Sequence, residues 1–317
     1  MLRLASVSLL ILPAVLAACA TTDDGINGSD EQDTTATTYV DIQEFGNGAE
    51  EAWYGIRDKL NGEFDQVCGD TFCEGDFSNI TPLSVFCSVT SKNATVHDCA
   101  WTFTASQHEV DPKLGTVVDD VVTYQCHFKP KTSGPKLIAA LQNAGDALHA
   151  TLPGMGSIYD TLGDCFAHPI GETPITVQAG TTYVDAENYY LSPKSIAAWN
   201  TGLTNLHSGF DQVCGDTFCS SDYSDVQALD LGCAVTKSTG NVKACTWNFG
   251  GSYGQIAATG AVAPVTKTWS CPVAVHGTIS AMIGVLTSTT DPETNAIQRP
   301  LPGGTSAYDS IAGCVTR

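Results

Sequence analysis

A ten-residue stretch of this chain occurs twice without change. The sequence FDQVCGDTFC spans Phe64–Cys73 and returns at Phe210–Cys219. An unbroken match of this length indicates that a whole structural unit has been duplicated. The sequence therefore predicts two tandem copies of one domain, residues 37–180 and 181–317, each long enough to bury a core of its own.

Other features repeat in the same order around this stretch. The pentapeptide TTYVD begins at Thr37 and again at Thr181, and Trp53 in the first copy corresponds to Trp199 in the second. Apolar residues recur every three or four positions over 53–67 and 196–213, which predicts an amphipathic helix in each copy. We expect these helices to start near Asn47, with Glu50 in the first turn, and at Ser192 before Pro193.

Strand patterns follow each helix. Alternating segments rich in Val, Thr and aromatic residues, separated by turn residues, predict antiparallel strands. A second helix comes after them, so each copy is expected to be an α+β domain with helices packed on one face of a sheet of three or more strands. The element order resembles that of cystatin-like folds, although such a likeness implies no function. The strands are expected near 84–89, 97–103, 117–128, 229–235, 243–249 and 265–273, and the second helices near 137–148 and 279–286.

Cysteines are frequent, with 13 in the chain. Cys19 belongs to the N-terminal signal described below, and the others divide equally between the copies. An even number in an exported protein predicts three disulfides per copy, although six cysteines allow 15 pairings. Cys87 and Cys99 flank a turn about equally, so they are expected to face each other across neighbouring strands. The predicted pairs are Cys68–Cys73, Cys87–Cys99 and Cys126–Cys165, with Cys214–Cys219, Cys233–Cys245 and Cys271–Cys314 in the second copy.

Zinc or redox chemistry is the alternative use of these cysteines. Structural zinc sites take closely spaced C-x2-4-C pairs, whereas Cys87 and Cys99 lie farther apart. Redox pairs have the spacing C-x-x-C, and Cys68 and Cys73 are separated by four residues. The spacing favours disulfides.

The charge balance excludes one class of partner. The chain has 34 acidic and 14 basic residues, which give a formal net charge of −20. An acidic surface repels phosphate backbones, so nucleic acid is not an expected partner. No glycine-rich phosphate loop followed by Lys-Ser/Thr occurs, and we predict no cofactor.

The N-terminus has the organisation of an export signal. Arg3 precedes an apolar run over 4–16 that is too short to span a bilayer, and small residues follow it. The tetrapeptide Leu16-Ala17-Ala18-Cys19 matches the lipobox, so residues 1–18 resemble the signal peptide of bacterial lipoproteins. This resemblance implies cleavage before Cys19, acylation of Cys19 with fatty acids such as palmitate, and attachment to a membrane. Ala20 in the next position implies sorting to the outer membrane, on its periplasmic face or at the cell surface.

Residues 19–36 have a composition that cannot form a core. They contain five acidic residues, no basic residue and almost no apolar side chain. We therefore predict that, after the acylated Cys19, this segment is a disordered acidic tether.

Two possible sites remain. Acidic residues near the repeated stretch could ligate calcium, but their spacing does not fit an EF-hand, and turn capping is the favoured interpretation. Gly250–Gly254 fits the G-x-S-x-G string of hydrolases, but it lacks the strand-to-helix context of a nucleophile elbow, which favours a chance match. The calcium candidates are Asp70, Asp76, Asp216 and Asp222.

No motif specifies a catalytic residue. The sequence thus favours an exported, membrane-anchored lipoprotein that is not an enzyme and binds a protein, peptide or glycan ligand through its two copies. The alternatives are a cell-envelope hydrolase with a site that the sequence does not reveal, or a purely structural envelope protein.

Overall fold

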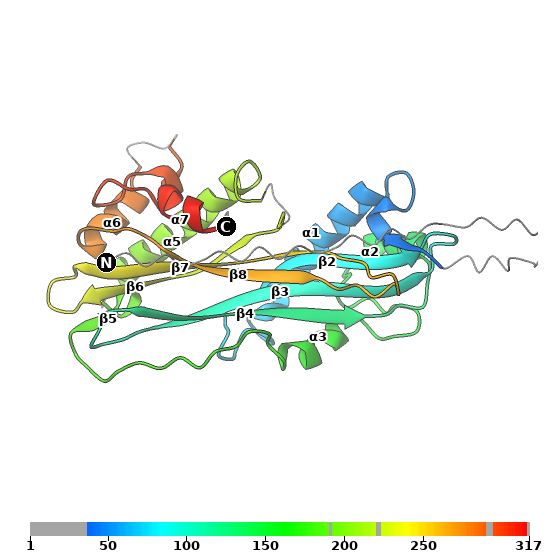
Figure 1. Cartoon of the computed structure of the whole chain (residues 1–317), viewed down its shortest axis with the longest axis horizontal. Helices are drawn as coiled ribbons and strands as arrows, with labels where there is room; N and C mark the ends of the chain where they lie inside the picture. Colours follow the sequence, from blue (N-terminus) through cyan, green and yellow to red (C-terminus); the bar gives the residue numbers. More distant parts are fainter. Residues whose placement is uncertain (1–36, 190–191, 220–222, 290–293, 316–317) are drawn as a thin grey trace, which may run out of the picture. The chain divides into compact units, whose positions relative to one another are not determined.

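The chain from Thr37 onward forms one compact unit in a computed structural model that describes residues 37–189, 192–219, 223–289 and 294–315. The unit is α+β, with two four-stranded antiparallel sheets ordered β1-β2-β3-β4 and β5-β6-β7-β8 (Figure 1). The two halves of the unit follow almost the same order of elements. The first contains β1 (Tyr39–Asp41), η1 (Ile42–Glu44), α1 (Ala49–Cys68), β2 (Thr81–Thr90), β3 (Val96–Val110), β4 (Val117–Phe128), α2 (Gly134–Asn143) and α3 (Tyr159–Phe166). The second contains β5 (Tyr183–Asp185), α4 (Ala186–Tyr189), α5 (Pro193–Cys214), β6 (Gln227–Thr236), β7 (Val242–Tyr253), β8 (Val265–Pro272), α6 (Ile279–Leu286), η2 (Ala296–Gln298) and α7 (Ala307–Val315).

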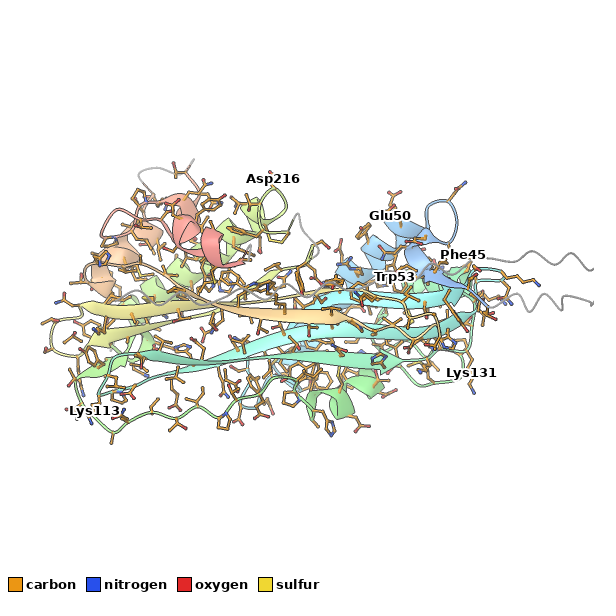
Figure 2. The ribbon with its side chains drawn as sticks, in the orientation of Figure 1. Phe45, Glu50, Trp53, Lys113, Lys131 and Asp216 are labelled. Carbon is orange, nitrogen blue, oxygen red and sulfur yellow. A yellow bond between two sulfur atoms is a disulfide. The ribbon has the colours of Figure 1, made fainter. Side chains whose placement is uncertain are left out.

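A long helix covers one face of each sheet. Trp53 points from α1 toward the sheet, while Glu50 lies on the solvent side of the helix (Figure 2). The indole N–H of Trp53 donates to the carbonyl oxygen of Val85 at 3.0 Å, so this large side chain is buried without losing a hydrogen bond. Ile56, Leu60 and Phe64 continue the buried stripe at helical spacing.

The ends of the predicted helices differ from their expected positions in the first half. Helix α1 is capped by Gly48, whose φ of 76° suits glycine, and not by Asn47. Helix α2 ends at Asn143, before the predicted limit at residue 148. There the carboxylate of Glu63 accepts the backbone N–H groups of Ala147 and Leu148 at 3.0 and 2.8 Å, which replaces the bonds of a further helical turn.

Helix α5 begins as predicted. Ser192 is its N-cap, and the Ser192 hydroxyl accepts the backbone N–H of Ser195. Pro193 follows in the first turn, where the lack of an N–H costs nothing.

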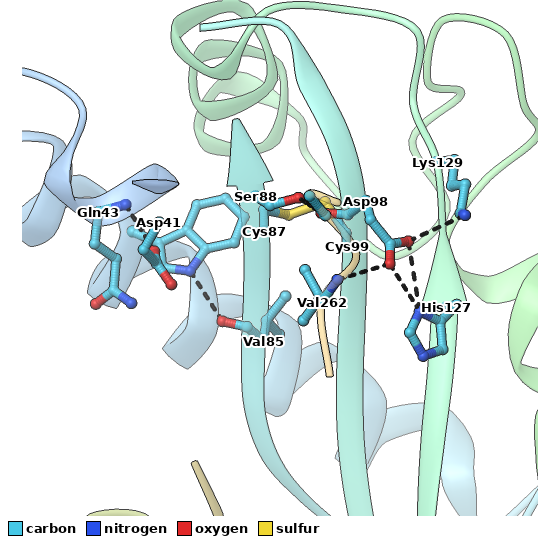
Figure 3. The surroundings of a disulfide bond; sticks show 12 residues. Asp41, Gln43, Val85, Cys87, Ser88, Asp98, Cys99, His127, Lys129 and Val262 are labelled. Atoms are coloured by element: carbon cyan, nitrogen blue, oxygen red, sulfur yellow. Dashed lines mark hydrogen bonds and ion pairs between the residues drawn. A yellow bond between two sulfur atoms is a disulfide. The ribbon is translucent and has the colours of Figure 1, made fainter. Parts of the chain in front are cut away.

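Six disulfides join the twelve cysteines of the described residues, in the pairs expected from the sequence. Cys87 and Cys99 lie directly opposite each other in β2 and β3, with Cα atoms 4.1 Å apart (Figure 3). Each half has one bond in the turn after its long helix, one across two strands, and one that ties its last helix to an edge strand. The pairs are Cys68–Cys73, Cys87–Cys99, Cys126–Cys165, Cys214–Cys219, Cys233–Cys245 and Cys271–Cys314.

The second face of each sheet is buried against the other sheet. Strand β3 packs on β6, and β4 packs on β7 and β8. This interface consists mainly of small and hydroxyl-bearing side chains, and its glycines leave room for larger groups. A Cβ on Gly232 would lie 2.5 Å from the ring of His108. Buried residues of the two facing surfaces include Ser84, Ala100, Thr102, Thr104, Ala234, Asn248 and Ser252.

The connections β3–β4 and β7–β8 each form hydrogen bonds with the opposite half. In the turn between β3 and β4, where Figure 2 labels Lys113, the carbonyl oxygen of Pro112 accepts the N–H groups of Thr182 and Tyr183, both at 3.1 Å. In the connection between β7 and β8, the N–H of Val262 donates to the buried carboxylate of Asp98 at 2.9 Å (Figure 3). Each half therefore contributes one strand connection that is hydrogen-bonded to the other half.

Candidate functional site

The most unusual polar cluster lies where β3 meets the second sheet. His108, near the end of β3, donates from Nε2 to Asp185 at 2.8 Å and from Nδ1 to Asp230 at 2.5 Å. Asp185 ends β5 and Asp230 lies in β6, so both carboxylates come from the other half of the chain. The His108 side chain is only 12% exposed. An imidazole bonded on both nitrogens to carboxylates links the two sheets.

The electrostatics fix the protonation state of His108. Burial alone lowers the pKa of a histidine, but the hydrogen bonds and negative charges of Asp185 and Asp230 outweigh it and raise the pKa of His108 to about 10. The ring is therefore an imidazolium at neutral pH, and neither nitrogen carries a free lone pair. A general base needs such a lone pair, so this arrangement suits a structural cation.

A third carboxylate lies next to this cluster. Asp119 of β4 is opposite His108 in the ladder, and its Oδ1 accepts the side-chain amide of Asn248 at 2.9 Å. Burial raises the pKa of Asp119 above its usual range, against the opposing effects of Asn248 and His108. Asn248 is fully buried in β7, so this contact adds a second polar link between the sheets.

Beside His108 there is a cleft of about 750 Å³. It is bounded by the loop after α1, the end of β3, the connection before β5, and the start of the second half. Five carboxylates and one lysine lie on its walls, so the cleft is acidic. The charged groups are Asp76, Glu109, Asp185, Glu187, Asp230, Lys237 and the His108 imidazolium.

The serine of the G-x-S-x-G string, Ser252, is buried and hydrogen-bonded within the sheet. Ser252 is inside strand β7 and is 1% exposed. Its hydroxyl donates to Asp225 at 2.6 Å and lies 2.7 Å from the hydroxyl of Thr102. The same position in the first half is Ser106, which bonds to Asn79. In each half, this bond attaches the loop after the long helix to an inner strand of the sheet, β3 or β7. Ser252 is not on a strand-to-helix turn.

The calcium candidates do not converge among the described residues. Asp70 and Asp216 are exposed in the turns after α1 and α5, and Figure 2 labels Asp216. Asp76 lies on the wall of the cleft, while Asp222 and the lipid-anchor candidate Cys19 fall outside the described residues. Within the described ranges, no group of three or more His, Cys, Asp or Glu side chains is placed to hold a metal ion.

Sequence reasoning missed the His108 cluster. Asp185 belongs to the repeated TTYVD pentapeptide, in which one carboxylate oxygen caps the following turn. Asp185 accepts the N–H of Glu187 in this way, as Asp41 does with Gln43. The other oxygen of Asp185 reaches His108. None of the seven histidines has a counterpart in the other copy, so the sequence did not distinguish His108 from the others, and its partners lie 77 and 122 residues further along the chain.

Comparisons with known proteins add no further information. No known protein family, curated protein sequence or solved structure matches this chain. Among the helices of the described residues, none combines the length and apolar character needed to cross a membrane.

Proposed function

We propose that this chain is an exported, lipid-anchored binding protein without catalytic activity, built from two tandem copies of one domain, and that its ligand site is the acidic cleft beside His108. The N-terminal signal resembling that of bacterial lipoproteins supports export and an anchor at Cys19 in the cell envelope. The cleft carries the binding proposal, because its walls come from both halves of the chain.

The charges of the cleft define the ligand class. Asp76, Glu109 and Glu187 are exposed, and no hydrogen bond to the carboxylates of these three residues is found within the described part of the chain. Lys237 is the single lysine on the walls. A cationic peptide segment, with lysine or arginine side chains, complements this surface. The open cleft also suits an extended ligand better than an enclosed small molecule.

The hydrogen bonds of His108 and Ser252 support a binding function over a catalytic one. His108 is protonated and bonded on both nitrogens, and Ser252 is buried in a strand beside a carboxylate. In a nucleophile–base pair, the base has a free lone pair and the nucleophile is accessible to a substrate. Neither condition holds at these two residues.

The test is a binding titration with a defined probe. The protein for this test comprises residues 20–317, which are the folded unit and the segment before it. We expect a fluorescent lysine-rich peptide to bind this protein, and an acidic peptide of equal length not to bind it. The triple variant Asp76→Asn, Glu109→Gln, Glu187→Gln removes three cleft charges and leaves the His108 contacts intact. Its affinity for the lysine-rich peptide should fall roughly tenfold or more, since each lost charge pair contributes about 0.5–1 kcal/mol.

A matched variant separates a local site from general attraction to an acidic protein. Glu50→Gln, Glu51→Gln, Asp58→Asn changes the net charge equally on the exposed face of α1. This control should bind the peptide as the unaltered protein does. If both triple variants lose the same affinity, or if neither loses any, the cleft is not the ligand site.

A further inference from the structure

The outer edge of β4 is already occupied by the chain itself. After α3, the connection toward β5 runs alongside β4 (Figure 1). Ile170 pairs with Thr123 as an antiparallel bridge, with N–H to O=C bonds of 3.0 and 2.8 Å. Three residues on, the N–H and hydroxyl of Thr173 donate to Asp120 at 2.9 and 3.1 Å. The connection therefore acts as a short additional strand on the edge of the first sheet.

Strand β8 is the counterpart of β4 in the second sheet. Thr123 is opposite Thr104 in the first sheet, and Thr268 is opposite Gly250 at the same place in the second. Backbone groups of alternate residues in an edge strand point away from the neighbouring strand. Because Thr123 points its N–H and C=O groups outward to Ile170, Thr268 points its own groups outward in the same way. Within the described residues, no hydrogen bond to these two groups of Thr268 is found.

The side chains around this edge differ from those of a protected edge. Lysines often guard edge strands by extending across them. Here the ammonium of Lys267 instead lies over the ring of Trp269, 4.9 Å from its centroid, and 5.8 Å from that of Tyr223. The Nε1–H of Trp269 is buried and has no partner among the described residues. The edge thus has open backbone groups at Thr268, while the ammonium of Lys267 lies over the rings of Trp269 and Tyr223.

We propose that the outer edge of β8 binds an extended peptide from another protein by antiparallel strand addition. A residue of the peptide opposite Thr268 makes the two backbone bonds that Ile170 makes to Thr123. The occupant of β4 defines the partner's chemistry, which is a β-branched apolar residue flanked by small residues or proline in an extended segment. This site is separate from the acidic cleft and does not depend on it.

Hydrogen exchange on the folded protein tests the edge directly. In the free protein, the amide of Thr268 should exchange rapidly and that of Thr123 slowly, since only the latter is bonded. A synthetic peptide with the sequence of residues 167–175 is the probe, and its scrambled form is the control. Adding the probe should slow exchange at Thr268 roughly tenfold or more at saturation, with little change in the cleft.

Two substitutions separate backbone from side-chain effects. Thr268→Pro removes the outward N–H without removing a bond to β7, and it should abolish probe binding. Thr268→Val keeps the N–H and should retain binding. Protection of Thr268 in the free monomer would overturn the proposal, because the edge would then be covered already. Protection that rises with protein concentration in step with dimer formation would also overturn it, in favour of a second copy of the chain.

Discussion

His108 is a cation whose two anionic partners both come from the other half of the chain. The carboxylates of Asp185 and Asp230 lie on neighbouring strands of the second sheet, and the packing of the sheets brings His108 to both of them, where the imidazolium neutralises part of their mutual repulsion. Gly232 makes the contact possible, because any side chain there would collide with the ring. A single histidine therefore couples protonation to the packing of the sheets.

Replacing His108 should lower stability in a pH-dependent way. The pKa of His108 is about 10 in the folded chain and about 6.5 when unfolded, so its stabilising effect is complete below pH 6.5 and disappears as the pH rises through 10. His108→Gln should reduce the free energy of unfolding by about 2–3 kcal/mol at pH 6 and by much less near pH 10.5. Denaturant unfolding of both proteins across this range measures the difference.

His127→Gln is the matched control for this prediction. His127 is more exposed, and the carboxylate that it contacts, Asp98, also has Lys129 and the Val262 N–H as partners. Replacing His127 should lower the free energy of unfolding by less than about 1 kcal/mol at both pH 6 and pH 10.5. An equal loss at pH 6 and pH 10.5 in His108→Gln would show that the ring acts by packing and not by charge.

The disulfides that tie α3 and α7 to edge strands have the largest sequence separations of the six, 39 and 43 residues. Helix α3 has only eight residues, which is too short to be stable alone. The bond between Cys126 and Cys165 holds it on β4, where Phe166 packs on Phe103 and Tyr124. The last helix of each half, α3 or α7, is thus held on its sheet by a disulfide.

Removing the Cys126–Cys165 disulfide should lower the free energy of unfolding more than removing the short-range Cys68–Cys73 disulfide. Cys126→Ala with Cys165→Ala should lower the free energy of unfolding by about 4 kcal/mol, because a long loop is released in the unfolded chain. Cys68→Ala with Cys73→Ala, which opens a separation of five residues, should cost about 2 kcal/mol. Denaturation midpoints of the two double variants give the comparison. If opening the short loop lowered the free energy of unfolding more than opening the long one, loop entropy would not explain the stabilisation by these disulfides.

The elements that the sequence predicted best are those with one buried face. Helices α1 and α5 have a clear apolar stripe, and the disulfide between Cys87 and Cys99 followed from equal distances to a turn. The packing of sheet on sheet was not predictable, because the inner faces carry residues such as Thr102 and Ser252 that resemble solvent-facing positions. Their burial depends on hydrogen bonds between residues far apart in the chain.

The whole molecule pairs a folded unit with an N-terminal segment of different composition. We predict that Cys19 is acylated and that residues 20–36 act as the tether expected from their acidic composition. Both the acidic cleft and the edge of β8 would then be available to ligands in the envelope.

Loss of the anchor residue should release the protein. Expressed in a bacterium with labelled fatty acid, the full chain should incorporate label and sediment with membranes. Cys19→Ser should lose the label and most of the sedimenting protein, while Thr21→Ser, which leaves the lipobox intact, should behave as the parent. A Cys19→Ser protein that stays labelled and membrane-bound would refute lipid attachment at this residue.

The six disulfides found among the described residues each lie within one half of the unit or the other, so none of these six joins the halves. Their covalent connection is the single chain that follows α3, and everything else between them is reversible packing. A protease cut within 174–180 would therefore turn an intramolecular association into a bimolecular one. The nicked protein would hold together at high concentration and fall apart on dilution, and its dissociation constant would report the strength of the contact between the sheets.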